Sequence, residues 1–239
     1  MFVTGGTMPE PASITLLTTG CIGLGVRFLQ RRYREAKPYV DWAVSLALLV
    51  LTGPLMLACA ALVKLTSRGP AFYTQERVGL HGRIFRIIKL RTMRCDAEVE
   101  TGPVWAFGQE DPRVTPIGAF LRRTHLDEFP QLINVLKGDM SLVGPRPERP
   151  CFVEELKVRV PGYERRLAVK PGITGLAQIR AGYDETIRDV RRKVKLDCLY
   201  MRRMCWWVDV MIITGTISRV LFQRGGRRGS KPETKAVRA

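Results

Sequence analysis

The feature that most constrains the fold is an uncharged run of 22 residues, Trp42–Val63. At a rise of about 1.5 Å per residue, an α-helix of this length crosses the hydrocarbon core of a bilayer. Gly53 and Pro54 stand at the middle of the run. Proline removes a backbone donor and clashes with the preceding turn, so we expect the helix to bend there. The run therefore predicts a membrane helix that bends at a proline.

Basic residues flank this run on both sides, with Arg31–Lys37 before it and Lys64, Arg68 and Arg77 after it. A helix that spans a membrane usually keeps its positive residues on one side. Basic ends on both sides favour a re-entrant helix, which enters one leaflet, turns at Gly53-Pro54 and returns to the same face. A kinked transmembrane span is the alternative interpretation.

Two further apolar runs have weaker membrane signals. Ala12–Val26 is diluted by Thr and Gly and is followed by basic residues, a pattern typical of an N-terminal anchor; an interfacial segment fits it equally well. Met204–Phe222 contains Trp206, Trp207 and Asp209, which favour the headgroup level over the middle of a bilayer. This run predicts an interfacial amphipathic helix, with a buried core helix as the alternative.

The charge balance is strongly basic, with 39 Lys and Arg against 22 Asp and Glu and a net charge of +17. Such a balance indicates polyanionic partners: nucleic acid, anionic lipid or phosphorylated substrates. No helix-turn-helix, zinc or RNA-recognition signature accompanies it, so a basic nucleic-acid-binding protein is the weaker alternative. The six cysteines form no CxxC pair, which indicates free thiols in a reducing compartment.

The middle of the chain predicts two short helices around an acid pair. Thr115-Pro116 supplies a capping residue and a proline at the first helical position, and this helix should end near Arg123. A second helix should begin close to Asp127–Glu128, because Pro130 is tolerated only in a first turn, and Lys137-Gly138 should close it. We expect the free N–H groups at its start to stabilise the carboxylates in their ionised form.

Adjacent acids beside arginines suit phosphoryl chemistry, because the cations let a carboxylate approach an anionic phosphate. Downstream, Pro145-Arg146-Pro147 fixes the backbone on both sides of one arginine, so its side chain is presented at little entropic cost. A hairpin expected over Tyr73–Leu90 adds further basic residues on its second arm. The chain contains no GxGxxG or Walker-type loop, which leaves the common ATP and NAD folds unsupported.

Several motifs in one order make the chain resemble the bacterial sugar transferase family, the monotopic polyprenyl-phosphate phosphoglycosyl transferases. The resemblance runs from about Tyr39 to Phe222, most of the chain. The chain resembles the short form of the family, with one extra N-terminal run. The motifs are Gly69–Gly79, Lys89–Met93, Asp111–Thr115, Leu126–Pro130, Gly138–Glu148 and Lys170–Gly175.

The resemblance implies transfer of a phosphosugar from a UDP-sugar to polyprenyl (undecaprenyl) phosphate, with release of UMP, as the first step of a surface polysaccharide or glycoconjugate. It implies that Asp127 forms a covalent phosphosugar intermediate. It also implies that Asp127 and Glu128 hold Mg2+, and that both are catalytic. The substrate-binding residues that it implies are Lys89, Arg122, Pro145, Arg146 and Pro147.

The resemblance also implies a location, the bacterial inner membrane, with the catalytic domain on the cytoplasmic face and in contact with lipid of the cytoplasmic leaflet. The partners expected are the UDP-sugar and the polyprenyl phosphate, without nucleic acid; a homodimer is left open. A membrane scaffold without activity is a second alternative. The residues do not distinguish which sugar is transferred or which glycan is made.

The predicted fold class is α+β and mostly helical. It is a membrane-associated monotopic domain with a proline-broken re-entrant helix, a small β-hairpin region and interfacial amphipathic helices. The expected parts are an N-terminal anchor or interfacial segment with a basic stretch (1–38), the re-entrant helix (39–66), a cytosolic catalytic domain (67–203), an interfacial helix (204–222) and a disordered basic tail (223–239).

Overall fold

The structure, a computed structural model, describes residues 11–97, 111–181 and 186–222, and the side chains among them from Phe28 onward. These residues are mostly helical and include two small sheets, each of two strands. The mostly helical α+β prediction is therefore confirmed. The side chains of the expected N-terminal anchor (12–26) and the basic tail (223–239) lie outside the described residues.

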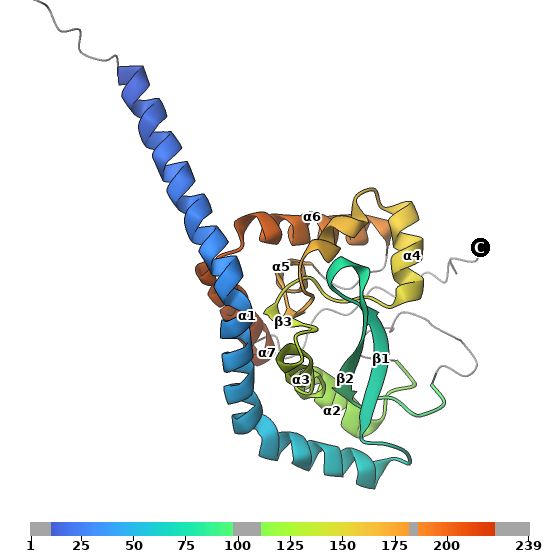
Figure 1. Ribbon diagram of the computed structural model, residues 1–239. Coiled ribbons are helices and arrows are strands. Elements are labelled where there is room, and N and C mark those ends of the chain that lie inside the picture. The colour runs from blue at the N-terminus through green and yellow to red at the C-terminus, as the bar shows by residue number, and fades with distance from the viewer. Residues whose placement is uncertain (1–10, 98–110, 182–185, 223–239) are drawn as a thin grey trace, which may run out of the picture.

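Helix α1 (Pro11–Thr66) is 56 residues long and continues through both Pro38 and Pro54. Figure 1 shows its first part extending away from the other elements, its middle passing alongside them, and a change of direction in its light-blue part. Pro54 belongs to that part by residue number, and its missing backbone donor accounts for a bend. The helix is thus bent but not broken, because the hydrogen bonds on either side of one proline are enough to continue it. Re-entry into one leaflet stays a prediction.

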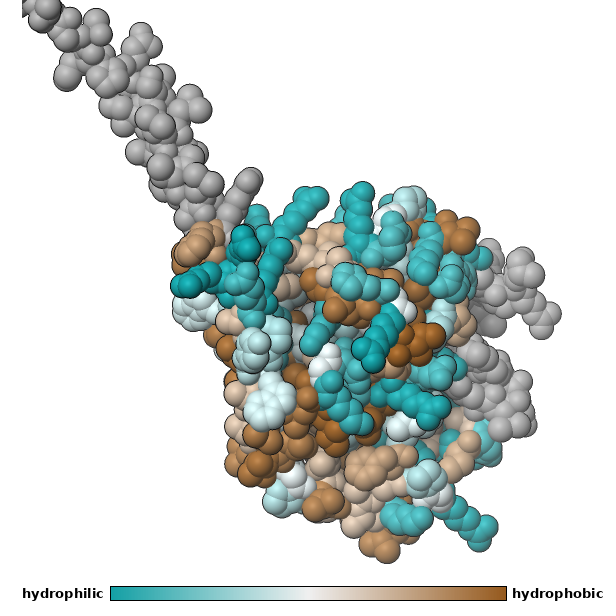
Figure 2. Space-filling view, in the orientation of Figure 1, coloured by the Kyte–Doolittle hydropathy of each residue, from teal (hydrophilic) through white to brown (hydrophobic). Residues whose placement is uncertain are grey.

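The packed face of α1 is polar before Pro54 and apolar after it, where Cys59, Ala60 and Val63 are buried, and many of its exposed side chains are apolar. Lys37, Asp41 and Ser45 are buried against the rest of the chain at a spacing of four residues. Figure 2 shows apolar side chains gathered at the lower left, over α1. Among the described residues, Phe28–Thr66 is the one helix long and apolar enough to cross a membrane. Its exposed apolar side chains include Tyr39, Val40, Val44, Leu48, Val50, Leu51, Leu55, Leu57, Leu62 and Leu65.

Strands β1 (Phe72–Val78) and β2 (Ile84–Leu90) form the predicted hairpin. They pair antiparallel, with Phe72 opposite Leu90 and Val78 opposite Ile84. The connecting 3-10 turn, η1 (Leu80–Gly82), contains His81 and Gly82 with positive φ, as a tight reversal of the chain requires. The hairpin prediction is confirmed.

Helix α2 (Pro116–Thr124) begins as predicted, since the side chain of Thr115 accepts a hydrogen bond from the backbone of Gly118. The next expectation is wrong. His125 adopts a left-handed conformation with φ 55°, and a 3-10 turn, η2 (Leu126–Glu128), follows it. Helix α3 (Gln131–Leu136) begins only after Pro130. The acid pair therefore lies on a separate 3-10 turn, which the left-handed His125 separates from α2 and Pro130 separates from α3.

The second sheet joins two distant parts of the chain, since β3 (Ser141–Val143) pairs parallel with β4 (Gly172–Thr174). The segment between these strands contains α4 (Pro150–Arg159) and the 3-10 helix η3 (Tyr163–Ala168). Three helices follow β4: α5 (Leu176–Arg180), α6 (Ile187–Arg203) and α7 (Trp206–Phe222). One apolar cluster packs η3 and α4 against α6 and β1.

Helix α7 packs through one face and exposes apolar side chains on another. Asp209 and Ile212 are buried, whereas Trp206, Trp207 and Phe222 are exposed. Asp209 accepts hydrogen bonds from Tyr33 Oη at 2.5 Å and Tyr200 Oη at 2.9 Å, and it forms an ion pair with Lys37. The predicted helix is confirmed, and this network explains how an acid is accommodated in an apolar run. Its contact with a membrane interface stays a prediction.

Candidate active site

The site is centred on the two acids of η2. Asp127 is buried, with 8% of its surface exposed, and Glu128 is partly buried. The left-handed His125 before them and Pro130 after them hold the turn between α2 and α3. The sequence predicted the acids but not the turn, because a left-handed conformation at a histidine has no strong local signal.

Glu128 is held by two cations from distant parts of the chain. Its Oε1 atom lies 2.9 Å from Lys89 Nζ, at the end of β2, and 2.9 Å from Arg146 Nη2, just after β3. Only 13% of the Glu128 side chain is exposed, so solvent screens these ion pairs weakly. The structure therefore brings together three of the residues predicted from the sequence.

The two acids have opposite pKa shifts. Burial raises the pKa of Asp127, and the charge of Glu128 adds to this effect, while Lys89, Arg122 and His125 act against it. Burial also acts to raise the pKa of Glu128, but the charges of Arg146 and Lys89 outweigh burial and lower it. The expectation that both carboxylates are stabilised as anions is therefore wrong for Asp127, because burial dominates at a position without a helix N-terminus.

The strand that contains Lys89 is bound by a residue that the sequence analysis did not single out. The side chain of Asn134, on α3, accepts a hydrogen bond from Ile88 N at 3.0 Å and donates one to Arg86 O at 2.7 Å. These bonds satisfy the edge of β2 that faces away from β1. Asn134 is 1% exposed, and an asparagine inside the apolar pattern of α3 is the signal that identifies such a residue.

Arg122 lies on α2 and donates from Nε to Thr92 Oγ1 at 2.9 Å. Its charge lowers the pKa of Asp127 against the effect of burial, so it is near that carboxylate. Pro145 and Pro147 are buried on either side of Arg146, whose side chain is 43% exposed. The prolines therefore shape the backbone that presents Arg146.

The acid pair supplies ligand types that Mg2+ takes. Among the described parts of the chain, no group of three His, Cys, Asp or Glu residues is placed to hold a metal. Mg2+ is commonly bound by one or two carboxylates, with waters and substrate phosphates completing its coordination. Asp127 and Glu128 provide two carboxylates of this kind. The donor set therefore suits an ion that binds together with a phosphorylated substrate.

The fold and the site together define a class of protein: its described residues are mostly helical, include one long apolar helix, and contain two adjacent acids, one buried and the other paired with two cations. A family model narrows this class. The chain belongs to the bacterial sugar transferase family, whose model matches residues 32–223.

Individual relatives agree with this assignment. The chain is 42% identical over 196 residues to a UDP-N-acetylgalactosamine-undecaprenyl-phosphate N-acetylgalactosaminephosphotransferase of Aeromonas hydrophila, a match covering 82% of this chain and 46% of the relative. It is 43% identical over 188 residues to a UDP-glucose:undecaprenyl-phosphate glucose-1-phosphate transferase of Caulobacter vibrioides, covering 77% and 69%. A Bacillus subtilis protein named as a similar N-acetylgalactosaminyl 1-phosphate transferase is 52% identical over 136 residues, covering 57% and 75%. The chain thus spans about half the length of the first of these relatives and more than two thirds of the other two.

Proposed function

We propose that the chain transfers a phosphosugar from a UDP-sugar to undecaprenyl phosphate and releases UMP. The observation that carries the proposal is the surrounding of Asp127 and Glu128 by cations from separate elements, Lys89 on β2, Arg122 on α2 and Arg146 after β3. A carboxylate can attack a diphosphate only where nearby positive charge offsets the repulsion between the anions. The printed names of the relatives support this substrate pair.

The proposed chemistry has two steps, both centred on Asp127. A carboxylate oxygen of Asp127 attacks the β-phosphorus, and the bond from this phosphorus to the bridging oxygen breaks, so that UMP leaves with the electron pair. An oxygen of the lipid phosphate then attacks the same phosphorus and frees the Asp127 carboxylate. Covalent catalysis of this kind divides one transfer between two anions into two easier displacements.

The cations of the site have separate tasks in this scheme. Glu128 fixes the positions of Lys89 and Arg146 through ion pairs of 2.9 Å, and both cations are then available to bind phosphate oxygens. Asp127 and Glu128 would hold Mg2+, which, when bound, supplies positive charge that neutralises the diphosphate. Arg122 offsets the burial of Asp127 and favours its ionised, nucleophilic form.

The location that we propose is the cytoplasmic leaflet of the bacterial inner membrane, with α1 entering that leaflet and returning. Its support is the arrangement of α1, in which Lys37, Asp41 and Ser45 pack on the domain while a long series of apolar side chains is exposed. An apolar exposed face is costly in water and favourable in lipid. The polyprenyl phosphate keeps its phosphate group at the level of the lipid headgroups. This location therefore brings that phosphate group to a site that cytosolic UDP-sugar can also reach. Its product would initiate a surface polysaccharide.

The test combines turnover with a direct search for the intermediate. The full chain, purified in detergent, is incubated with undecaprenyl phosphate, Mg2+ and each of several UDP-sugars, and UMP is measured. With donor alone, intact-protein mass spectrometry should detect the added mass of one sugar phosphate. After digestion, the added mass should be found on a peptide that contains Asp127. The Asp127→Asn variant is the matched control and should show neither UMP nor adduct. No UMP with any donor would refute the activity, and UMP with an adduct elsewhere would refute the assigned nucleophile.

A further inference from the structure

The turn that presents Arg146 is held through its backbone carbonyls. Its two prolines have no N–H to donate, so hydrogen bonds to the carbonyls must fix it. All four carbonyls from residue 145 to residue 148 accept a bond. The donors are Gly172 N to Pro145 O at 2.9 Å, Arg166 Nη2 to Arg146 O at 3.0 Å, Arg77 Nη1 to Pro147 O at 3.1 Å and Val78 N to Glu148 O at 2.9 Å.

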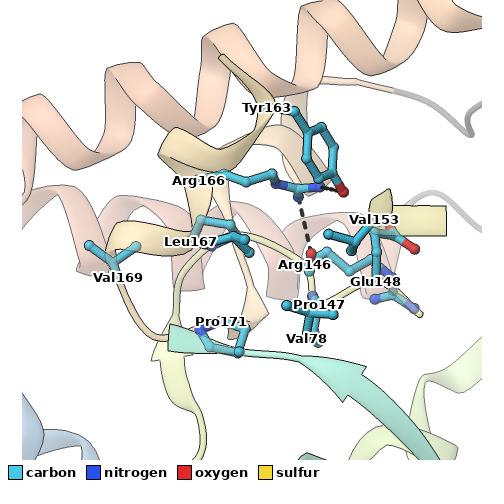
Figure 3. A pocket seen from close by; sticks show the side chains of 12 residues that line it. Val78, Arg146, Pro147, Glu148, Val153, Tyr163, Arg166, Leu167, Val169 and Pro171 are labelled. Carbon is cyan, nitrogen blue, oxygen red and sulfur yellow. Dashed lines mark hydrogen bonds between the residues drawn. The ribbon is translucent and has the colours of Figure 1, made fainter. Parts of the chain in front are cut away.

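Arg166 is the donor for Arg146 itself, and it is held on several sides. Its Nη1 atom donates to Tyr163 Oη at 2.9 Å, and its Nη2 atom lies 2.9 Å from Asp197 Oδ2 on α6. Figure 3 shows the guanidinium between the Tyr163 ring and the backbone oxygen of Arg146. Arg166, Tyr163 and Asp197 are 6%, 0% and 1% exposed, so this network is removed from solvent.

Packing alone gives a weak reason for such a network. Burying a guanidinium and a carboxylate costs solvation free energy, and apolar residues of similar volume often stabilise a protein as well or better. A planar guanidinium can, however, donate in several fixed directions at once, which suits a rigid brace for a carbonyl. The brace ends at the residue whose side chain pairs with Glu128.

We propose that Arg166, anchored by Asp197 and Tyr163, is a positioning residue that holds Arg146 against Glu128 for phosphate binding. The proposal rests on the proposed function and deepens it. Arg166 and Asp197 touch neither of the two acids through any contact that the structure describes, so they act through Arg146. Without the bond to its carbonyl, the Arg146 backbone can shift and its guanidinium no longer meets the donor phosphate.

The test is a double-mutant cycle in the full chain, with UMP release measured at varied UDP-sugar concentration. Arg166→Lys keeps the charge that Asp197 needs but loses the fork that reaches both other partners, so the variant is expected to fold. We expect its kcat/KM to be about tenfold lower, the size expected for a lost hydrogen bond to a charged group, mainly through a higher KM. Tyr163→Phe removes only one anchor of Arg166 and should give a smaller change of the same kind.

The decisive comparison is with Arg146→Gln, which removes the guanidinium itself. If Arg166 acts through Arg146, adding Arg166→Lys to Arg146→Gln lowers kcat/KM by no more than about twofold further. The exposed neighbour provides the matched control, and Arg165→Lys should leave kcat and KM unchanged. A purely structural role would lower the apparent kcat at constant KM, through loss of active enzyme.

The outcomes separate the two proposals. Losses that multiply in the double variant, or a lower kcat at unchanged KM in Arg166→Lys, would overturn the positioning role while wild-type turnover upholds the transferase. Wild-type chain that releases no UMP from any donor would overturn the transferase activity, and the role of Arg166 in it.

Discussion

Asp127 and Glu128 are consecutive residues on one 3-10 turn, and the structure shifts the pKa values of their carboxyl groups in opposite directions. Burial raises the pKa of Asp127, whereas the charges of Arg146 and Lys89 overcome burial and lower that of Glu128. Neighbouring acids whose environments separate their pKa values commonly have different tasks in catalysis. Asp127, whose anion is the less stabilised, is the proposed nucleophile, and Glu128 holds Lys89 and Arg146. This difference leads to opposite expectations for substitutions at the two positions.

Asp127→Asn should abolish UMP release without lowering the thermal midpoint at neutral pH. Because the folded state raises the pKa of Asp127, it favours the neutral acid, and this contribution to stability is lost as pH rises through that pKa. The neutral amide of Asn removes the cost of the buried anion. Thermal unfolding in detergent and an assay for UMP measure the two effects. An active variant, or a midpoint several degrees below wild type, contradicts this expectation.

Glu128→Gln should destabilise the chain by about 1–3 kcal/mol at neutral pH, because Lys89 and Arg146 lose their shared counter-charge. The lowered pKa of Glu128 means that its stabilising contribution is present above its unfolded pKa and is lost as pH falls toward its folded pKa. The difference in unfolding free energy between wild type and Glu128→Gln should therefore shrink below about pH 4. Denaturant titrations at pH 7 and in acid measure it. A difference that grows in acid would contradict the assigned ion pairs.

Asn134→Asp should destabilise the fold by at least about 2 kcal/mol, although it changes few atoms. The new carboxylate can still accept from Ile88 N, but it meets the carbonyl of Arg86 with a second acceptor in place of the amide donor. Position 134 is 1% exposed, so water cannot relieve this contact. Lys137→Gln, an exposed change near the end of the same helix, should stay within about 0.5 kcal/mol. Equal midpoints for both variants would show that the bonds of Asn134 to β2 contribute little.

Cysteine labelling tests the path of α1 through the membrane. In a background with the six native cysteines replaced by serine, single cysteines at the exposed positions Ala36 and Thr66 lie before and after the apolar stretch. A membrane-impermeant maleimide should label both in inside-out vesicles and neither in intact cells, because a re-entrant helix has both ends on the cytoplasmic face. A cysteine at exposed Arg159, in the catalytic part, reports that face as a control. Labelling of Ala36→Cys and Thr66→Cys from opposite sides would establish a transmembrane span.

Chelation should stop turnover. The two carboxylates offset part of the positive charge of the cations in the site, so part of the diphosphate charge has no partner without the metal ion. We expect EDTA to abolish UMP release and excess Mg2+ to restore it, with Ca2+ less effective because it prefers more ligands at longer distances. The thermal midpoint should remain within experimental error after EDTA, because the ion is proposed to bind with the substrate. Full activity in EDTA would remove Mg2+ from the proposed reaction.

Local chemistry in the sequence was sufficient for several elements. The hairpin followed from the Gly-containing turn after β1, and the start of α2 followed from Thr115-Pro116. The bend in α1 lies in the part that includes Pro54. The start of α3 was misplaced, because the residues after the left-handed His125 form a 3-10 turn and the helix begins only at Gln131, after Pro130, and the local sequence pattern does not distinguish this arrangement from a single helix.

The sequence by itself determined the membrane-like helix, the family and the residues of the candidate site, since these depend on composition and on motifs contained in short segments. Only the tertiary structure decided their partners: Glu128 pairs with Lys89, 39 positions earlier, and with Arg146, 18 positions later. It also decided that Lys37 pairs with Asp209 and that Arg166 reaches the carbonyl of Arg146. The physical reason is that burial and distance set charge interactions and pKa values, and both arise only when segments far apart in the chain pack together.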